Sequence, residues 1–279
     1  MNTVTKRSLE KNDWPLVQLN GLTLIQSPLM NKVERFVHAF TTRLGGSTPE
    51  PLNWFNLGRH WPTEESRAEA MVNRKTLCDA LGLDDSQLTV PGQQHTTNIF
   101  LLKEGGEKGL ALPNYDGVAT GATDHPILLH FADCTPVMLL DPKKRVLCVM
   151  HAGWRGTAGG IVTKGVQLLH AALGCQPSDM VAAVGPAIGS CCYETGEDVA
   201  EALTKTIADP QARQQVIERG PGGKPHPDLK AVNAVQLYEA GVGQVDITAW
   251  CTACRPDLFY SHRQSGGKTG RQGALACLR

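Results

Sequence analysis

The sequence predicts a mixed α+β fold, in which helices and strands are interspersed, and three observations predict it. Apolar runs of strand length are separated by longer segments with helical periodicity. Three strand-like runs follow one another between residues 127 and 150 with no helix between them, unlike a succession of βαβ units. No linker rich in Pro, Gly or Ser divides the 279 residues. We therefore expect one domain over residues 21–279, after a polar and poorly ordered segment over residues 1–20.

The first part of the chain is expected to form two strands, a long loop and a helix. Residues 22–26 and 35–40 are short apolar runs that are typical of strands. The next segment, 41–58, is rich in Gly, Pro and Asn, and a loop of this length is usually functional. Helical spacing, with acidic residues early and Gly82 at the end, predicts a helix over 64–82.

The remaining elements follow from the same two patterns. Apolar runs bounded by turn residues predict strands at 87–90, 97–102, 127–132, 137–141, 146–150, 180–184, 244–249 and 258–262. Helical periodicity predicts helices over 157–173, 195–208 and 228–241, and Asp228 is placed to cap the last of them. The order of these elements favours sheets of mixed strand direction over a doubly wound parallel sheet.

The composition excludes several classes of partner. Lys and Arg number 27, as do Asp and Glu, so no net charge draws the chain to nucleic acid or to an anionic membrane. No apolar run approaches the roughly 20 residues needed to cross a bilayer. The nine cysteines lack the spacing of a disulfide framework, and the N-terminus lacks a signal peptide. We expect a cytoplasmic monomer with reduced thiols that acts on small molecules.

The segment 131–155 carries the most informative chemistry. Cys134 follows the apolar run 127–132 and His151 follows the run 146–150, so both are expected where two strands of one sheet end. A thiolate and an imidazole that converge can bind a metal ion such as zinc, or act as a nucleophile and its base. Both interpretations remain open at the level of the sequence.

His95 would complete a set of two histidines and one cysteine with a free fourth position. Three protein ligands and an open position are typical of a catalytic zinc ion. Each residue also has an ordinary alternative, Cys134 as a small buried apolar side chain and His95 as a solvated or hydrogen-bonded one. The spacings within the set, 39 and 17 residues, match no local metal-binding signature.

Two cysteine-containing motifs carry weaker signals. Residues 185–199 contain three glycines and the adjacent pair Cys191 and Cys192. They predict either a tight turn before a helix or a turn whose N–H groups bind an anion. Cys251 and Cys254 form a CxxC pair, but no second CxxC pair accompanies it, so we expect neither a zinc ribbon nor a thioredoxin-like site.

The C-terminal segment 262–272 contains GGKTG, which lacks the spacing of a nucleotide-binding phosphate loop. Arg263 and Arg271 in this segment could make bidentate contacts to an oxyanion. The alternative is that both are surface charges near the end of the chain.

Taken together, the motifs resemble the laccase-domain (YfiH-type) family, also called the multicopper polyphenol oxidase or purine nucleoside phosphorylase family. The matching segments occur in the order of the family and span about residues 36–279. They are FTTRLGG (40–46), NLGRH (56–60), QQH (93–95), DGVAT (116–120), ADCTPVMLLDP (132–142), HAGWRGT (151–157), GPAIGSCCYETGEDV (185–199), DLKAVNAVQL (228–237) and CTACRPDLFYSHRQSGGKTGRQ (251–272).

The resemblance implies a layered α/β/β/α sandwich of mixed sheets, similar to the catalytic domain of cytotoxic necrotizing factor. It implies a zinc ion on His95, Cys134 and His151, with copper as a metal that binds in vitro. The implied activity is cleavage of adenosine, inosine and S-methyl-5′-thioadenosine by phosphate, together with hydrolytic deamination of adenosine. The older laccase activity is disfavoured, because a multicopper enzyme needs further His-rich sites and the nine histidines include no HxH pair.

Four residues are candidates for this chemistry. Asp133 would carry the proton in deamination, as a carboxylate does in other zinc deaminases. It can share a site with its neighbour Cys134 if the chain turns between them, because successive strand residues point to opposite faces. Arg43, Arg155 and Arg263 would hold phosphate against the ribose. The alternatives are a hydrolase that uses the thiol without a metal, and a binding module without catalysis.

Overall fold

The computed structural model describes residues 9–59, 63–103, 105 and 112–279. Its strands are β1 (Leu16–Leu19), β2 (Leu22–Ile25), β3 (Phe36–Thr41), β4 (Ile99–Leu102), β5 (Gly117–Thr120), β6 (Ile127–Phe131), β7 (Thr135–Asp141), β8 (Val146–Ala152), β9 (Val181–Val184), β10 (Ile217–Arg219), β11 (Pro225–Pro227), β12 (Gln244–Ile247) and β13 (Gln272–Leu278). Its α-helices are α1 (Glu64–Ala80), α2 (Trp154–Ala158), α3 (Ile161–Leu173), α4 (Glu197–Thr204), α5 (Pro210–Gln215) and α6 (Leu229–Glu239). The mixed α+β class expected from the sequence is confirmed.

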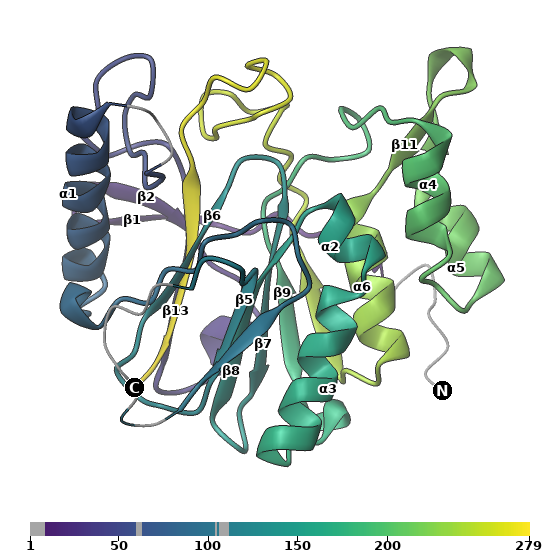
Figure 1. Cartoon of the computed structure of the whole chain (residues 1–279), viewed down its shortest axis with the longest axis horizontal. Helices are drawn as coiled ribbons and strands as arrows, with labels where there is room; N and C mark the ends of the chain where they lie inside the picture. Colours follow the sequence, from purple (N-terminus) through teal and green to yellow (C-terminus); the bar gives the residue numbers. More distant parts are fainter. Residues whose placement is uncertain (1–8, 60–62, 104, 106–111) are drawn as a thin grey trace.

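Two large sheets lie between helices (Figure 1). The first is antiparallel, with the strand order β1-β2-β3-β13-β6. The second has the order β12-β9-β7-β8-β5-β4 and is mixed, because its two outermost pairs, β12 with β9 and β4 with β5, are parallel. Strands β10 and β11 form a separate antiparallel pair.

Three apolar layers make this architecture the expected α/β/β/α sandwich. Leu77 of α1 belongs to a cluster between that helix and the first sheet. Along β7, Met138 and Leu140 belong to the core between the two sheets, whereas Val137 and Leu139 belong to the core under α3 and α6. This division follows from the alternation of side chains along a strand. Because both faces of β7 are covered, its sequence is apolar throughout instead of alternating.

The helix expected over 157–173 is divided into α2 and α3. Gly159 and Gly160 separate them, and Gly160 has a φ of 70°, a left-handed conformation that glycine adopts without steric cost. At Gly159, a Cβ atom would lie 2.5 Å from Cγ2 of Thr97. The break turns the chain between the end of β8 and the long helix α3.

Strand β13 is central to the first sheet, although the sequence does not predict it. It pairs with β3 on one side and β6 on the other. Its small residues, including Gly273, Ala274 and Ala276, lack the β-branched and aromatic signal of a strand. Strand β5 and helix α5 are also not predicted. Conversely, residues 258–262 form no strand, and Tyr260 N–H there donates to the side chain of Gln272 at 2.9 Å.

The expectation of a poorly ordered segment over residues 1–20 is wrong for residues 9–20, which the structure describes. Residues 1–8 lie outside the described residues. Strand β1 pairs with β2 over its whole length, and Trp14 is 1% exposed, with its indole N–H donating to Asp246 at 3.0 Å. A buried tryptophan and a strand pair hold this segment on the domain.

None of the described helices is both long enough and apolar enough to span a membrane.

Candidate active site

Cys134 lies in the connection that leads the chain from one sheet to the other. Strand β6 of the first sheet ends at Phe131, and β7 of the second sheet begins at Thr135. Asp133 has a φ of 84°, so the chain turns just before Cys134. The expectation that the apolar runs before Cys134 and His151 belong to one sheet is therefore wrong, because β6 and β8 lie in different sheets.

His151 reaches Cys134 because β7 and β8 are antiparallel neighbours. Pro136, two residues beyond Cys134, is the register partner of His151. Nδ1 of His151 lies 2.8 Å from Oδ1 of Asp116. An ionised carboxylate can only accept a hydrogen bond, so Nδ1 is the donor. Nε2 is therefore the ring nitrogen that is left to interact beside the Cys134 thiol.

His95 is positioned by the same carboxylate. Asp116 is fully buried, and its oxygens accept hydrogen bonds from the backbone N–H groups of Gln94 at 3.0 Å, His95 at 3.0 Å and Thr96 at 2.7 Å. The Thr96 hydroxyl donates to it as well, at 2.8 Å. One carboxylate therefore fixes both the loop that carries the first imidazole and the ring of the second.

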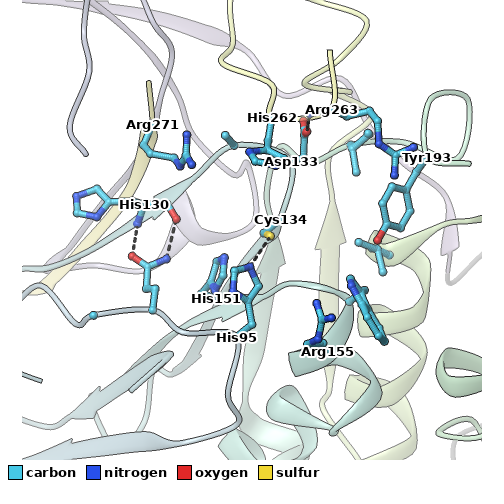
Figure 2. Close-up of a pocket in the computed structure, with 16 residues that line it drawn as sticks. His95, His130, Asp133, Cys134, His151, Arg155, Tyr193, His262, Arg263 and Arg271 are labelled. Atoms are coloured by element: carbon cyan, nitrogen blue, oxygen red, sulfur yellow. Dashed lines mark hydrogen bonds between the residues drawn. The ribbon is translucent and has the colours of Figure 1, made fainter. Parts of the chain in front are cut away.

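The ligand atoms of His95, Cys134 and His151 converge on one point (Figure 2). One atom from each lies within 4.8 Å of the other two, and Sγ of Cys134 is 3.7 Å from Nε2 of His95. In a tetrahedral zinc site, bond lengths of about 2.3 Å to sulfur and 2.0 Å to nitrogen separate the sulfur and nitrogen atoms by about 3.5 Å. The three residues therefore fit a zinc-type ion with one position left open.

The protonation states of these groups are coupled. Burial alone would raise the pKa of Cys134, but His151 and His95 lower it to about 6. Burial alone would lower the pKa of His151, but the Cys134 thiolate and Asp116 raise it to about 9. The pKa of Asp116 falls to about 2, because hydrogen bonds from His151 and Thr96 outweigh its burial. Without a metal, Cys134 and His151 therefore form a thiolate–imidazolium pair at neutral pH, and a metal ion that binds the thiolate would displace the proton from Nε2 of His151.

Gly153 permits the close approach of the ligands. A Cβ atom at this position would lie 2.8 Å from Cδ2 of His95 and 3.0 Å from Sγ of Cys134. Such contacts would force a side chain away from the shared point, so the glycine immediately after β8 belongs to the site.

A pocket of about 490 Å³ opens beside the three ligands. Its lining includes Arg155, Arg263 and Arg271, whereas Asp133 is the one carboxylate among the described lining residues. Figure 2 shows the arginines on different sides of Cys134. The volume is within the range of small-molecule sites, about 300–1,000 Å³. A chain without net charge has thus concentrated positive charge at one cavity.

Two of the predicted arginines line this pocket. Arg155 lies on α2, and its guanidinium carbon is 4.3 Å from the centroid of the Trp154 ring. Arg263 donates its backbone N–H to Oδ2 of Asp133 at 2.7 Å and its guanidinium to the carbonyl of Glu194 at 2.8 Å. Both side chains are exposed to solvent, where an anion can reach them.

Asp133 lines the pocket beside Cys134, because its left-handed backbone turns the chain between them. Its two carboxylate oxygens accept from the hydroxyl of Thr252 and from the N–H of Arg263, each at 2.7 Å. The carboxylate therefore also holds two C-terminal loop segments on the pocket wall.

Arg43 does not line the pocket, so the structure does not support its predicted place in a phosphate clamp. Its guanidinium donates to the carbonyl of Asn53 at 2.7 and 3.1 Å and to the carbonyl of Pro256 at 3.0 Å. It also lies over the Tyr260 ring, 4.8 Å from the centroid. Arg43 thus attaches the loop 41–58 to the C-terminal segment, because backbone carbonyls occupy its donors.

Reasoning from the sequence did not single out Asp116 or Tyr193. Asp116 precedes Gly117, and Asp-Gly before a strand is usually interpreted as a turn. Tyr193 lies in the turn region after β9, and its ring carries the guanidinium of Arg263 at 5.1 Å. A signal for Asp116 was available, since a metal-binding histidine commonly donates to a carboxylate.

The fold and the site define a class, an α/β/β/α protein with two histidines and a cysteine beside a cationic pocket. The model of the family described as multi-copper polyphenol oxidoreductase laccase matches residues 37–279. The chain belongs to this family.

Similar proteins carry a more specific name. The purine nucleoside phosphorylase YlmD of Geobacillus stearothermophilus is 34% identical over 248 residues, which cover 86% of this chain and 89% of that protein. The purine nucleoside phosphorylase LACC1 of Homo sapiens is 30% identical over 90% of this chain and 57% of that protein. The crystal structure of YlmD from Geobacillus stearothermophilus has a TM-score of 0.87 at 31% identity, covering 96% of this chain and all of that one. That of the Bacillus licheniformis hypothetical protein YfiH has a TM-score of 0.85 at 32% identity, covering 93% and 97%.

Proposed function

We propose that this protein is a zinc-dependent purine nucleoside phosphorylase that cleaves adenosine, inosine and S-methyl-5′-thioadenosine with phosphate, and that the same site deaminates adenosine. The observation that carries the proposal is the convergence of His95, Cys134 and His151 beside a cationic pocket. The names of the relatives support the phosphorylase activity.

Zinc is the ion that we assign to the three ligands, because a thiolate with two imidazoles suits a borderline metal and leaves a position open. When bound, it would supply a Lewis acid at the wall of the pocket. Asp116 would orient His151 and keep its Nε2 available. The three side chains would thereby hold the reacting end of the pocket in a fixed place.

The arginines are the groups that we assign to phosphate. Arg155, Arg263 and Arg271 each present a guanidinium at the pocket, and a guanidinium can bind two phosphate oxygens at once. Cleavage of the glycosidic bond develops positive charge on the ribose. A phosphate held by these residues would stabilise that charge and would be placed to bond to the anomeric carbon.

The purine would be held by the aromatic part of the lining. Trp154 and Tyr193 both line the pocket and offer flat apolar faces. Each ring is also in contact with an arginine, Trp154 with Arg155 and Tyr193 with Arg263. This arrangement would bring a stacked base and an arginine-bound phosphate into one cavity.

For deamination we assign proton transfer to Asp133, the carboxylate nearest to the ligands along the chain. It lies next to Cys134 and lines the same pocket. Its hydrogen bonds from Thr252 and Arg263 would fix its orientation at the pocket wall.

Product analysis tests the proposal. Adenosine is incubated with the zinc-loaded protein, with and without phosphate. We expect ribose 1-phosphate only when phosphate is present, in an amount equal to the adenine and hypoxanthine released together, and inosine in either case. If no product exceeded its level in a heat-treated sample, the enzymatic assignment would be contradicted and a non-catalytic binding module would be favoured.

A metal-independent hydrolase is the second candidate, because the lowered pKa of Cys134, about 6, and its contact with His151 also describe a nucleophile and its base. The second imidazole, His95, on the same sulfur favours the metal. Activity that survives chelation and is abolished by iodoacetamide would establish the hydrolase. A laccase reaction gains no similar support, since the part of the chain described here groups histidines as potential ligands at this site alone.

A further inference from the structure

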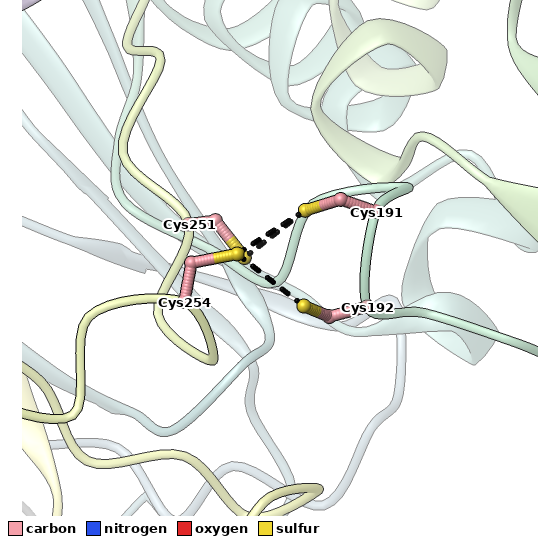
Figure 3. Close-up of side chains that lie close together, drawn as sticks. All are labelled: Cys191, Cys192, Cys251 and Cys254. Carbon is pink, nitrogen blue, oxygen red and sulfur yellow. Dashed lines mark hydrogen bonds between the residues drawn. The ribbon is translucent and has the colours of Figure 1, made fainter.

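Cys191, Cys192, Cys251 and Cys254 form a four-cysteine cluster that is separate from the three proposed ligands (Figure 3). All four sulfur atoms lie within 4.8 Å of one another. Sγ of Cys254 is 3.4 Å from Sγ of both Cys191 and Cys192, and Sγ of Cys191 is 3.7 Å from Sγ of Cys251. The proposed reaction uses none of these thiols.

The cluster forms because two parallel strands end side by side. Strands β9 and β12 are parallel neighbours, and beyond them Ala187 forms another parallel bridge, with Cys251. A turn in which Cys192 N–H donates to the carbonyl of Gly189 at 3.0 Å brings the adjacent cysteines toward the CxxC pair. The sequence offered no second CxxC pair, but the fold supplies two thiols from a segment about 60 residues earlier.

The spacing of the sulfur atoms fits a single tetrahedral ion. With zinc–sulfur bonds of about 2.3 Å, a tetrahedral site separates its sulfur atoms by about 3.8 Å. The separations of 3.4 and 3.7 Å in the cluster are close to this value, whereas a disulfide needs about 2.05 Å. A cluster of several irons spreads its thiolates further apart, because each binds a different iron.

The surroundings suit bound thiolates. Gly189 N–H donates to Sγ of Cys251 at 3.2 Å. The buried Lys230, 1% exposed, donates to the carbonyls of Thr248 and Trp250, each at 2.8 Å, immediately before the CxxC pair. Four thiolates around a divalent ion carry a net negative charge, which a nearby buried cation and N–H donors stabilise.

We propose that the four-cysteine cluster binds one structural zinc ion, distinct from the ion assigned to His95, Cys134 and His151. Four protein ligands leave no open position, so the site would be structural instead of catalytic. The ion would tie the segment after β9 to the segment after β12. The first of these segments also carries Ile188 and Tyr193, which line the pocket, so the ion would fix one wall of the active site.

Metal analysis of the full-length chain tests the proposal. We expect two zinc ions per chain in the wild type and in the control Cys175→Ala, which removes a buried cysteine outside both sites. One ion should remain in Cys134→Ala, and one in the double variant Cys192→Ala/Cys254→Ala. If the double variant kept two ions, the proposal would be overturned. If Cys134→Ala kept two but the double variant lost one, only the active-site assignment would fail.

Cobalt substitution reports the ligands directly. Loaded into Cys134→Ala, one cobalt ion per chain should give intense thiolate-to-cobalt charge-transfer bands and the visible bands of a tetrahedral site. The triple variant Cys134→Ala/Cys192→Ala/Cys254→Ala, loaded with cobalt in the same way, should lack these bands. A weak octahedral spectrum in Cys134→Ala would contradict a four-thiolate site.

A measurement on the wild-type chain avoids any folding defect of the variants. Cys191 and Cys254 are exposed, so iodoacetamide can reach both thiols after the metal is removed. Burial and the neighbouring cysteines raise the pKa of both thiols, so the reaction is run at alkaline pH, where more of the reactive thiolate is present. Zinc should protect them by at least about tenfold in rate, as measured by peptide mass spectrometry. Equal rates with and without zinc would overturn the proposal, as would a Cys191–Cys254 or Cys192–Cys254 disulfide in protein purified without oxygen.

Discussion

At the scale of single residues, Asp116 organises the site although it is not one of the three proposed ligands. Its carboxylate oxygens accept hydrogen bonds from Nδ1 of His151, from the backbone N–H groups of residues 94–96 and from the Thr96 hydroxyl. An orienting carboxylate of this kind fixes the ring and increases the basicity of the ligand nitrogen.

Replacement of Asp116 by Asn should therefore weaken zinc binding to His95, Cys134 and His151 by about 10–100-fold, since an amide cannot accept hydrogen bonds at both of its terminal atoms. Zinc affinity is measured by competition with a chromophoric chelator. The control is Asp79→Asn, an exposed carboxylate on α1. Unchanged affinity in Asp116→Asn would show that the carboxylate does not orient the ligand.

The three proposed ligands could be predicted, but not from local sequence pattern. His95, Cys134 and His151 lie 39 and 17 residues apart and match no local signature, so residue types alone suggested the set and the family resemblance assigned it to a metal. The fold brings one ligand atom of each within 4.8 Å of the others. Arg43 shows the limit of this approach. A motif identifies an arginine, whereas the carbonyls of Asn53 and Pro256 that occupy its donors are a property of the folded loop.

At the scale of elements, the junction between β8 and α2 depends on Gly153. Replacing it with Ala should lower zinc affinity by at least about tenfold, because the new Cβ atom would displace His95 or Cys134 from the shared point. The matched control is Gly121→Ala, where the nearest atoms are 3.8 Å from the added Cβ. Equal zinc affinities in the two variants would contradict a site that requires close approach at Gly153.

Strand β3 contains a histidine whose burial makes stability depend on pH. Burial lowers the pKa of His38 to about 4, against a weaker raising effect of Asp246, and Ser27 N–H donates to its Nε2 at 3.0 Å. The unfolded chain, with a histidine pKa near 6.5, therefore binds more protons than the native chain between pH 6.5 and 4. The stability that neutral His38 provides is present above pH 6.5 and is lost as the pH falls through this interval.

Between pH 7 and 4.5 the loss should amount to about 2.5 kcal/mol of the free energy of unfolding. Urea unfolding of the metal-free protein at both pH values measures it. The stability loss in His38→Gln, which remains neutral, should be smaller than that of the wild type by about this amount. The control His125→Gln changes a half-buried histidine and should behave like the wild type. An equal loss in His38→Gln would refute this source of pH dependence.

Elements with strong periodicity could be predicted from the sequence, whereas those defined by tertiary contacts could not. The helix α1 and the apolar strands β6, β7 and β8 lie within a few residues of their expected positions. Strand β13 escaped prediction because small residues form it and its two neighbours, β3 and β6, stabilise it. The expected helix 157–173 gave no hint that the Gly159–Gly160 pair would divide it.

At the scale of the whole molecule, charge is distributed so that a neutral chain presents a cationic cavity. The 27 basic and 27 acidic residues balance, but the described pocket lining contains three arginines and one carboxylate. This distribution favours an anionic ligand at the pocket.

Arg155→Gln and Arg263→Gln should each raise the KM for phosphate by about 10–100-fold, which corresponds to one charged hydrogen-bonded contact. The KM for the nucleoside should change much less. Lys143→Gln, which removes an exposed charge paired with Asp179, serves as the control. Phosphate saturation that is unaltered in both arginine variants would remove them from the anion site.

The central claim is that His95, Cys134 and His151 hold the metal at which phosphate cleaves a purine nucleoside. The most direct test measures ribose 1-phosphate release from inosine by the wild type and Cys134→Ala, with thermal unfolding as a check of the fold. We expect Cys134→Ala to remain folded and to lose at least about 1,000-fold in kcat/KM, with no recovery on addition of zinc. A folded Cys134→Ala variant that cleaves inosine at the wild-type rate would contradict the claim.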